Sequence, residues 1–298
     1  MSFSSDVKTE LCQIDLDRPC CIRAEAYGVL LFCNSFSPFG IRITTQSRVF
    51  GDRLPRLFQA AFGFGFDQQP EPGEAGKLTF QITDRDHIQQ ILDLYGYSRE
   101  GLMTHHINYG VLEEHCCYVA FCRGAFLTGG SVTDPLKGYH LEIATSHLYV
   151  HREFQALMPE LRLYPRETTR KANYITYFKQ SEAISTFLAT VGAPKCSQQI
   201  RTARQQKNLV NGVNRQYNCD VANVEKSVQA AQTQIKAIHT LEARGTLEQL
   251  PEKLQETAAL RCAHPELSLI QLADLCQPPV SKSCLNHRLR KLMELAGQ

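Results

Sequence analysis

The sequence predicts an α+β protein in which two related α/β repeats precede an all-α C-terminal domain. One observation is an internal echo, because six of the sixteen residues from Cys20 to Ser35 recur 96 positions later. Another is the alternation of apolar and polar residues over 41–46 and 141–145, which is typical of half-buried strands. Beyond residue 245 only helical periodicity remains.

The length and composition of the chain agree with this division. A chain of 298 residues is expected to form two or three domains, each with its own core. Its content of 43% hydrophobic and 21% charged residues is ordinary for a globular protein. The N-terminus has neither the basic nor the apolar region of a secretory signal, and no apolar run reaches the length of a membrane span. We therefore expect a cytoplasmic protein with no membrane partner.

The twelve cysteines do not form a recognisable metal motif. There is no CxxC pair, and the two Cys-Cys dipeptides at 20–21 and 116–117 are not expected to converge on one tetrahedral ion. Scattered thiols among apolar residues more often serve as small core side chains. His105, His106 and His140 have no companion ligands at a metal-binding spacing. The prediction is that the protein has no metal and no cofactor.

We assign residues 1–194 to the duplicated domain, with repeats at about 20–97 and 116–193. A short helix is expected over residues 2–14. Each repeat opens with a helix too apolar to lie at the surface, and continues with a strand, a helix, a second strand and a closing helix. Residues 63–76, rich in Gly, Pro and Glu, are expected to form a loop. The second strand of the second repeat, near residues 174–178, cannot be aligned by counting alone.

Residues 195–245 are predicted to be a basic helical linker. The first part, 195–215, is interpreted with equal weight as a solvated linker helix or as a segment that contacts DNA phosphates. Residues 218–244 have the apolar periodicity of a long connecting helix, with Val221, Val224 and Val228 on its stripe. The candidate auxiliary contacts to DNA here are Arg201, Arg204, Lys207 and Arg215.

Residues 246–298 have the pattern of a helix-turn-helix domain. Ser268 and Gln271 have capping-box spacing before a short helix, and the turn Gln277-Pro-Pro-Val280 follows. Ser281 is placed to cap a last helix, in which Leu285, Leu289, Leu292 and Ala296 form one apolar stripe. A short helix, a tight turn and a basic helix are typical of this motif.

The polar face of this last helix suits double-stranded DNA. Asn side chains pair with adenine edges and Arg with guanine edges, while Lys and a helix N-terminus suit phosphate oxygens. Residues 195–298 carry 14 basic and 9 acidic residues, whereas residues 1–194 carry 18 and 21. The competing interpretation is a merely solvated basic face. The predicted DNA-binding residues are Ser281, Lys282, Ser283, Asn286, His287, Arg288, Arg290 and Lys291.

Two apolar helices that end in small residues and precede strands resemble the LAGLIDADG homing-endonuclease fold. That resemblance implies that the helices pack along a pseudo-dyad and that antiparallel saddle sheets face DNA, with Arg42 and Thr44 as auxiliary contacts. It also implies an acid at the end of each helix to hold the catalytic metal. Cys33 and Gly129 stand at those positions, and neither is the hard oxygen donor that Mg²⁺ needs. Nuclease activity is therefore not expected.

The combination of such a domain with a helix-turn-helix resembles the WhiA family of transcriptional regulators. The resemblance is carried by Arg123-Gly-Ala-Phe-Leu-Thr-Gly-Gly130, Asn214-Arg-Gln-Tyr-Asn-Cys-Asp-Val-Ala-Asn223 and Ser281-Lys-Ser-Cys-Leu-Asn-His-Arg-Leu-Arg-Lys291. It implies sequence-specific binding to promoter DNA and control of genes for sporulation, cell division or chromosome segregation. The expected location is the nucleoid, and the expected protein partner is another transcription factor or RNA polymerase. Cys284 departs from the small residue expected there.

Two other functions stay open on the sequence. One is an active LAGLIDADG-type, metal-dependent endonuclease. The other is a protein-interaction module whose basic tail is incidental.

Overall fold

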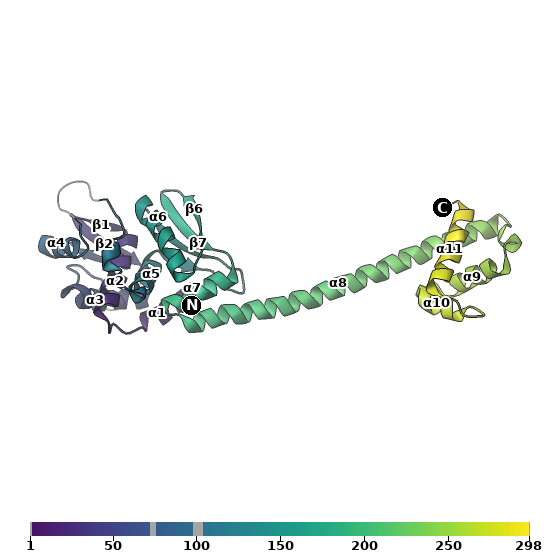
Figure 1. Cartoon of the computed structure of the whole chain (residues 1–298), viewed down its shortest axis with the longest axis horizontal. Coiled ribbons are helices and arrows are strands. Elements are labelled where there is room, and N and C mark those ends of the chain that lie inside the picture. The colour runs from purple at the N-terminus through teal and green to yellow at the C-terminus, as the bar shows by residue number, and fades with distance from the viewer. Residues whose placement is uncertain (1, 72–75, 98–103, 298) are drawn as a thin grey trace. The chain divides into compact units, whose positions relative to one another are not determined.

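Two apolar helices, α2 (Pro19–Phe32) and α5 (His115–Gly129), lie side by side within the N-terminal unit of the computed structural model (Figure 1). The structure describes residues 2–71, 76–97 and 104–297. The chain forms two compact units, residues 1–207 and 208–298, each with its own hydrophobic core. The two-core organisation follows the change of pattern in the sequence.

After α2 the first repeat has the predicted strand, helix, strand and helix, preceded by a short strand, β1, that was not predicted. Ser47 caps α3 and Asp84 caps α4, each through hydrogen bonds from backbone N–H groups to its side-chain oxygen. The predicted short helix at the N-terminus is also present. The elements, in order, are α1 (Phe3–Cys12), α2, β1 (Ser35–Ser37), β2 (Gly40–Thr45), α3 (Arg48–Phe62), β3 (Leu78–Ile82) and α4 (Arg85–Leu94).

The second repeat has the same order and one additional strand. That strand, β6, is fully exposed along its length, so its sequence carries no apolar alternation and it was not predicted. The elements are η1 (Tyr109–Val111), α5, β4 (Gly130–Val132), β5 (Leu141–Thr145), α6 (Leu148–Leu157), η2 (Met158–Leu161), β6 (Arg166–Arg170), β7 (Asn173–Phe178) and α7 (Ser181–Val191).

Both sheets are antiparallel, as predicted, with strand orders β1-β2-β3 and β4-β5-β7-β6. Strand pairing supplies the alignment that counting could not. Thr45 pairs with Leu78 in the first sheet, and Thr145 pairs with Tyr174 in the second. The first strand of each pair is therefore displaced by 100 residues between repeats and the second by 96, so that the four extra residues lie between α5 and β5.

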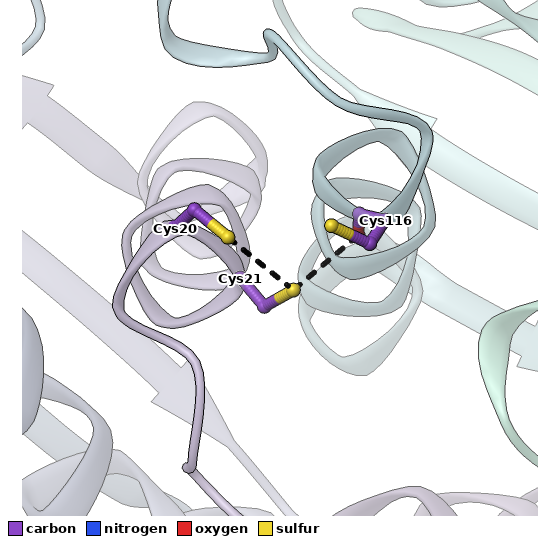
Figure 2. Close-up of side chains that lie close together, drawn as sticks. All are labelled: Cys20, Cys21 and Cys116. Carbon is purple, nitrogen blue, oxygen red and sulfur yellow. Dashed lines mark hydrogen bonds between the residues drawn. The ribbon is translucent and has the colours of Figure 1, made fainter.

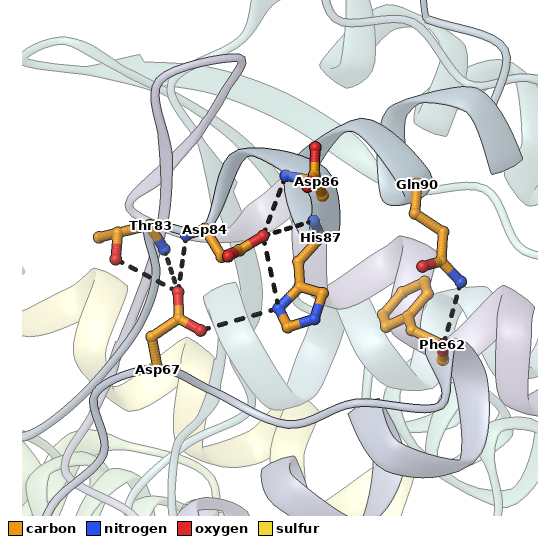
Figure 3. A network of polar contacts seen from close by, with 7 residues as sticks. All are labelled: Phe62, Asp67, Thr83, Asp84, Asp86, His87 and Gln90. Carbon is orange, nitrogen blue, oxygen red and sulfur yellow. Dashed lines mark hydrogen bonds and ion pairs between the residues drawn. The ribbon is translucent and has the colours of Figure 1, made fainter.

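A polar network holds the loop after α3 against the start of α4 (Figure 3). Asp67 Oδ2 accepts hydrogen bonds from the backbone N–H groups of Thr83 (2.6 Å) and Asp84 (2.8 Å). The His87 ring stacks on Phe64, with 3.9 Å between ring centroids. The loop predicted over residues 63–76 includes residues 72–75, which lie outside the described residues.

A single helix, α8 (Pro194–Ala243), replaces the two segments expected between the domains. Its first residues belong to the core of the first unit, where Cys196, Ile200 and Ala203 are buried. The apolar stripe predicted farther along is only partly covered, because Val224 and Val228 are exposed while Ala231 and Ile238 are buried. The stretch predicted to be a basic helical linker, residues 195–245, is thus almost entirely one continuous helix, since neither Gly212 nor the polar residues around it interrupt it.

The second unit is built from the end of α8 and a set of short helices. Leu285, Leu289 and Leu292 are each about 1% exposed, and with Ala296 they form the predicted apolar stripe. They pack with Ala258, Leu272 and Ile238 in one cluster. The elements after α8 are η3 (Leu247–Gln249), α9 (Glu252–Ala263), α10 (Leu269–Leu275) and α11 (Lys282–Ala296).

Candidate DNA-binding surface

The helix-turn-helix consists of α10, the turn after it and α11. Ser268 and Gln271 form the predicted capping box at the start of α10. Ser281 Oγ accepts a hydrogen bond from the Cys284 backbone N–H, 3.2 Å away, and so starts α11. The Val280 N–H donates to the Ala273 carbonyl at 3.0 Å, which closes the turn. These local bonds explain why the boundaries could be predicted from the sequence.

The outer face of α11 is polar and accessible. With the leucine stripe buried, Ser283, His287 and Arg290 lie on the opposite side of the helix and are exposed. Ser281, Lys282 and Lys291 are also exposed, and Asn286 is half-buried. Lys291 makes a solvent-exposed ion pair with Glu294, at 3.4 Å, of the kind that contributes little to stability. Seven of the eight predicted residues are therefore at least partly accessible along α11 and at its N-terminal cap.

Arg288 is the exception. Its side chain is only 13% exposed and pairs with Glu256 of α9 at 3.5 Å. The same guanidinium lies 3.5 Å from the Lys253 carbonyl and from Thr257 Oγ1. Because its donors point to α9, Arg288 fastens the two helices together, which differs from the DNA contact predicted for it. Periodicity placed it on a flank of α11, where a long side chain can turn either way.

Glu256 is a positioning residue that sequence reasoning missed. One carboxylate oxygen accepts a hydrogen bond from the backbone N–H of Gln277 at 2.8 Å, and the other faces Arg288. The side chain thus links α9 to both the turn and the recognition helix. A lone Glu on an amphipathic helix has no pattern that marks such a role.

A groove of about 270 Å³ adds further positive charge beside α11. Lys226 from α8 and Lys282 from α11 both line it, with Arg261 of α9 at its wall. Arg261 is 3% exposed and its Nε atom has no hydrogen-bond partner among the described residues. Lys226 is an additional candidate for phosphate contact, and it escaped prediction because it stands alone in the sequence.

The predicted auxiliary residues separate into two groups. Arg204 pairs with Glu182 at 3.2 Å, Lys207 donates to the Pro135 carbonyl at 2.7 Å, and Arg201 lies 3.5 Å from Ser185 Oγ. These three tie the start of α8 to the first unit. Arg42 and Arg215 are exposed, and Thr44 is half-buried on the same face of β2 as Arg42.

The two expected acid positions lie at the ends of α2 and α5. The Cys33 side chain is buried, and its Sγ atom lies 3.2 Å from the Ser35 carbonyl oxygen. Burial raises the pKa of this thiol to about 12. Gly129 has no room for any side chain, since a Cβ atom there would lie 2.4 Å from the backbone oxygen of Ala144. An acid pair with the spacing of a metal site does not fit at these positions.

A different group of side chains converges at the opposite ends of the same helices. The Sγ atoms of Cys20, Cys21 and Cys116 all lie within 4.8 Å of one another (Figure 2). Three of the four cysteines of the two Cys-Cys dipeptides therefore lie together, whereas the absence of a metal stays a prediction. Close packing of α2 on α5 brings their first turns together, a consequence that spacing in the sequence does not reveal.

Comparison with known proteins assigns both units. Residues 118–209 match the family model described as the WhiA LAGLIDADG-like domain, and residues 213–296 match the WhiA C-terminal HTH domain. A protein named "Probable cell division protein WhiA" from Ruminiclostridium cellulolyticum is 34% identical over 99% of this chain and 97% of its own length. The chain belongs to the WhiA family. The resemblance noted in the sequence is thus confirmed.

Other WhiA proteins are similar along the whole chain. The Staphylococcus aureus protein of the same printed name is 32% identical over 100% of this chain and 97% of its own. The crystal structure of full-length DUF199/WhiA from Thermotoga maritima covers 100% of this chain and 98% of that chain, with a TM-score of 0.61 at 21% identity. This likeness supports the fold. A family with a helix-turn-helix domain supports a DNA-binding regulator.

None of the helices in the described parts of the chain has the length and apolar content required to cross a membrane.

Proposed function

We propose that the protein is a sequence-specific DNA-binding transcriptional regulator that acts without nuclease chemistry. The observation that carries the proposal is the exposed polar face of α11, on which Lys282, His287 and Arg290 project from a helix fixed by a buried leucine stripe. Asn286 and Arg290 are the candidate readers of base edges. Ser281, Lys282, Ser283 and Lys291 are the candidate phosphate contacts, together with Lys226.

The targets that we propose are promoters of genes for sporulation or for cell division and chromosome segregation. The support is the printed name of the relatives, which refers to cell division. Binding at such promoters would place the protein on the nucleoid, in the company of RNA polymerase or another transcription factor. The first unit would then act as an auxiliary platform, with Arg42 and Thr44 facing outward from β2.

The absence of nuclease activity is supported by the crowding at Gly129 and by the buried thiol at Cys33. Phosphodiester cleavage in this fold needs carboxylates there to hold the metal. A plasmid nicking assay with Mg²⁺ tests this directly. Metal-dependent cleavage that persists in highly purified protein would establish the endonuclease instead.

The binding test begins by mapping genomic sites with immunoprecipitation of the full-length protein. Duplexes from those sites are then titrated by fluorescence anisotropy with the wild type and with Asn286→Ala, Arg290→Ala and the double variant. Each lost base contact is expected to weaken binding by about 1–3 kcal/mol at the cognate site. Lys195→Ala, an exposed change in the first unit, is the matched control. Unchanged promoter binding by the double variant would favour the protein-interaction module.

A further inference from the structure

The paired first turns of α2 and α5 bring three cysteine sulfur atoms together. Cys20 Sγ lies 3.9 Å from Cys21 Sγ, and the Cys116 sulfur lies within 4.8 Å of both (Figure 2). The cluster combines both cysteines of the first repeat's Cys-Cys dipeptide with the first cysteine of the second repeat's dipeptide.

The separation of the sulfur atoms suits tetrahedral coordination. A zinc–thiolate bond of about 2.3 Å places neighbouring sulfurs of a tetrahedron about 3.8 Å apart. The Cys20–Cys21 separation already matches this edge, and the upper limit of 4.8 Å leaves only small side-chain rotations to complete a site. Soft thiolate donors select zinc and similar thiophilic ions over Mg²⁺ or Ca²⁺.

The first turns of α2 and α5 lie beside these sulfurs. Among the described residues, neither α2 nor α5 has a side chain that caps its first turn, so the backbone N–H groups there stay available to anionic ligands. Arg18 acts electrostatically on Cys20, and Cys21 acts on Arg123. Cys20 is exposed and Cys116 is half-buried, which provides an entry route for an ion.

We propose that Cys20, Cys21 and Cys116 form a three-thiolate site for Zn²⁺, with the fourth position open to a water molecule, that links the two repeats at the starts of their central helices. Binding releases one proton from each thiol that coordinates the ion. The site is separate from α11 and from the lost acid positions. It gives the duplicated domain a structural metal in place of the catalytic metals of its fold.

The test is a spectroscopic titration of the reduced full-length protein with Co²⁺. One equivalent is expected to bind, with sulfur-to-cobalt charge-transfer absorption and the intense visible bands of tetrahedral coordination, and Zn²⁺ is expected to displace it. The Cys20→Ser/Cys116→Ser variant is expected to lose at least tenfold in affinity. It changes one exposed and one half-buried residue, so the fold should survive, which circular dichroism verifies.

Cys219→Ser/Cys284→Ser is the matched control, because both of its cysteines are exposed and lie outside the cluster. It should bind Co²⁺ like the wild type. The proposal is overturned if the wild type shows no thiolate bands, or if the bands survive in Cys20→Ser/Cys116→Ser. A disulfide within the cluster in freshly isolated protein would overturn it as well, since the thiols would then serve a redox role.

Discussion

Gly28 and Gly124 occupy equivalent positions in the two repeats, and each is pressed against the backbone of the other's helix. A Cβ atom on Gly28 would lie 2.2 Å from the Phe121 carbonyl oxygen, and one on Gly124 would lie 2.1 Å from the Glu25 carbonyl oxygen. The contacted residues are themselves 96 positions apart. The pseudo-dyad therefore passes between α2 and α5, and their close approach depends on both glycines.

Gly28→Ala is expected to destabilise the first unit by about 1–3 kcal/mol, since the added methyl group meets backbone atoms that cannot rotate away. The measurement is the denaturant midpoint of the first unit, followed by tyrosine fluorescence. Gly138→Ala is the control, because a Cβ atom there meets none of the described residues within 4 Å. Equal effects of the two changes would refute the packing explanation.

Glu25→Ala is expected to cost about 3–5 kcal/mol, as removal of one partner leaves buried charge uncompensated. Glu25 is 2% exposed and makes a two-pronged pair with Arg53, at 2.7 and 3.1 Å, while Arg123 lies 3.7 Å away. The comparison is Glu182→Ala at the exposed pair with Arg204, where about 0–1 kcal/mol is expected. Chemical denaturation measures the loss in free energy of unfolding for both variants. Similar losses would contradict the larger contribution expected of the buried pair.

Arg288 and Arg290 are neighbours in sequence with opposite expected roles. Arg288→Ala should lower the stability of the second unit by about 1–3 kcal/mol, because its charge-assisted bonds to α9 are lost. Arg290→Ala should leave the melting temperature unchanged and weaken DNA binding. Thermal unfolding and anisotropy are measured on the same preparations. If Arg288→Ala keeps the stability of the second unit but loses DNA affinity, the DNA contact predicted for Arg288 from the sequence would be supported.

The salt dependence of DNA binding reports how many phosphates the protein neutralises. Neutralisation of about five phosphates predicts a slope of log K against log salt of about −4 to −5. Lys282→Ala and Lys226→Ala should each make the slope shallower by about one. Lys195→Ala should leave it unchanged. If Lys226→Ala behaves like this control, the groove beside α11 does not face the DNA backbone.

Acid should destabilise the first unit through His147. Desolvation and the neighbouring His105 lower the pKa of His147 from 6.5 to about 4, and the two rings stack 3.8 Å apart. Between these pH values the unfolded histidine takes up a proton while the folded one does not, so stability falls as the pH drops. Unfolding midpoints are measured at neutral pH and at pH values between 4 and 6.5. The decrease in midpoint on acidification should be smaller for His147→Phe, which keeps an aromatic ring, than for the wild type. His239→Gln, at an exposed site, should follow the wild type.

Several features were predictable because their causes are local. The caps at Ser268 and Ser281 depend on residues three positions away, and the leucine stripe of α11 follows from helical geometry alone. The strand pattern at residues 41–45 likewise places Ile41 and Ile43 inside and Arg42 outside. For such elements, the spacing of side chains along the sequence is enough to predict the cap residues and the buried face.

What the sequence determined by itself is the duplication, the class of each domain and the family, since these rest on order and spacing along the chain. The tertiary structure alone decided that Arg288 turns to Glu256, that Arg204 and Lys207 bind their own unit, and that two Cys-Cys dipeptides meet. Each of these depends on which distant backbone lies within reach of a side chain. That proximity arises only when α2 packs on α5, α9 packs on α11, and α8 begins against the first core.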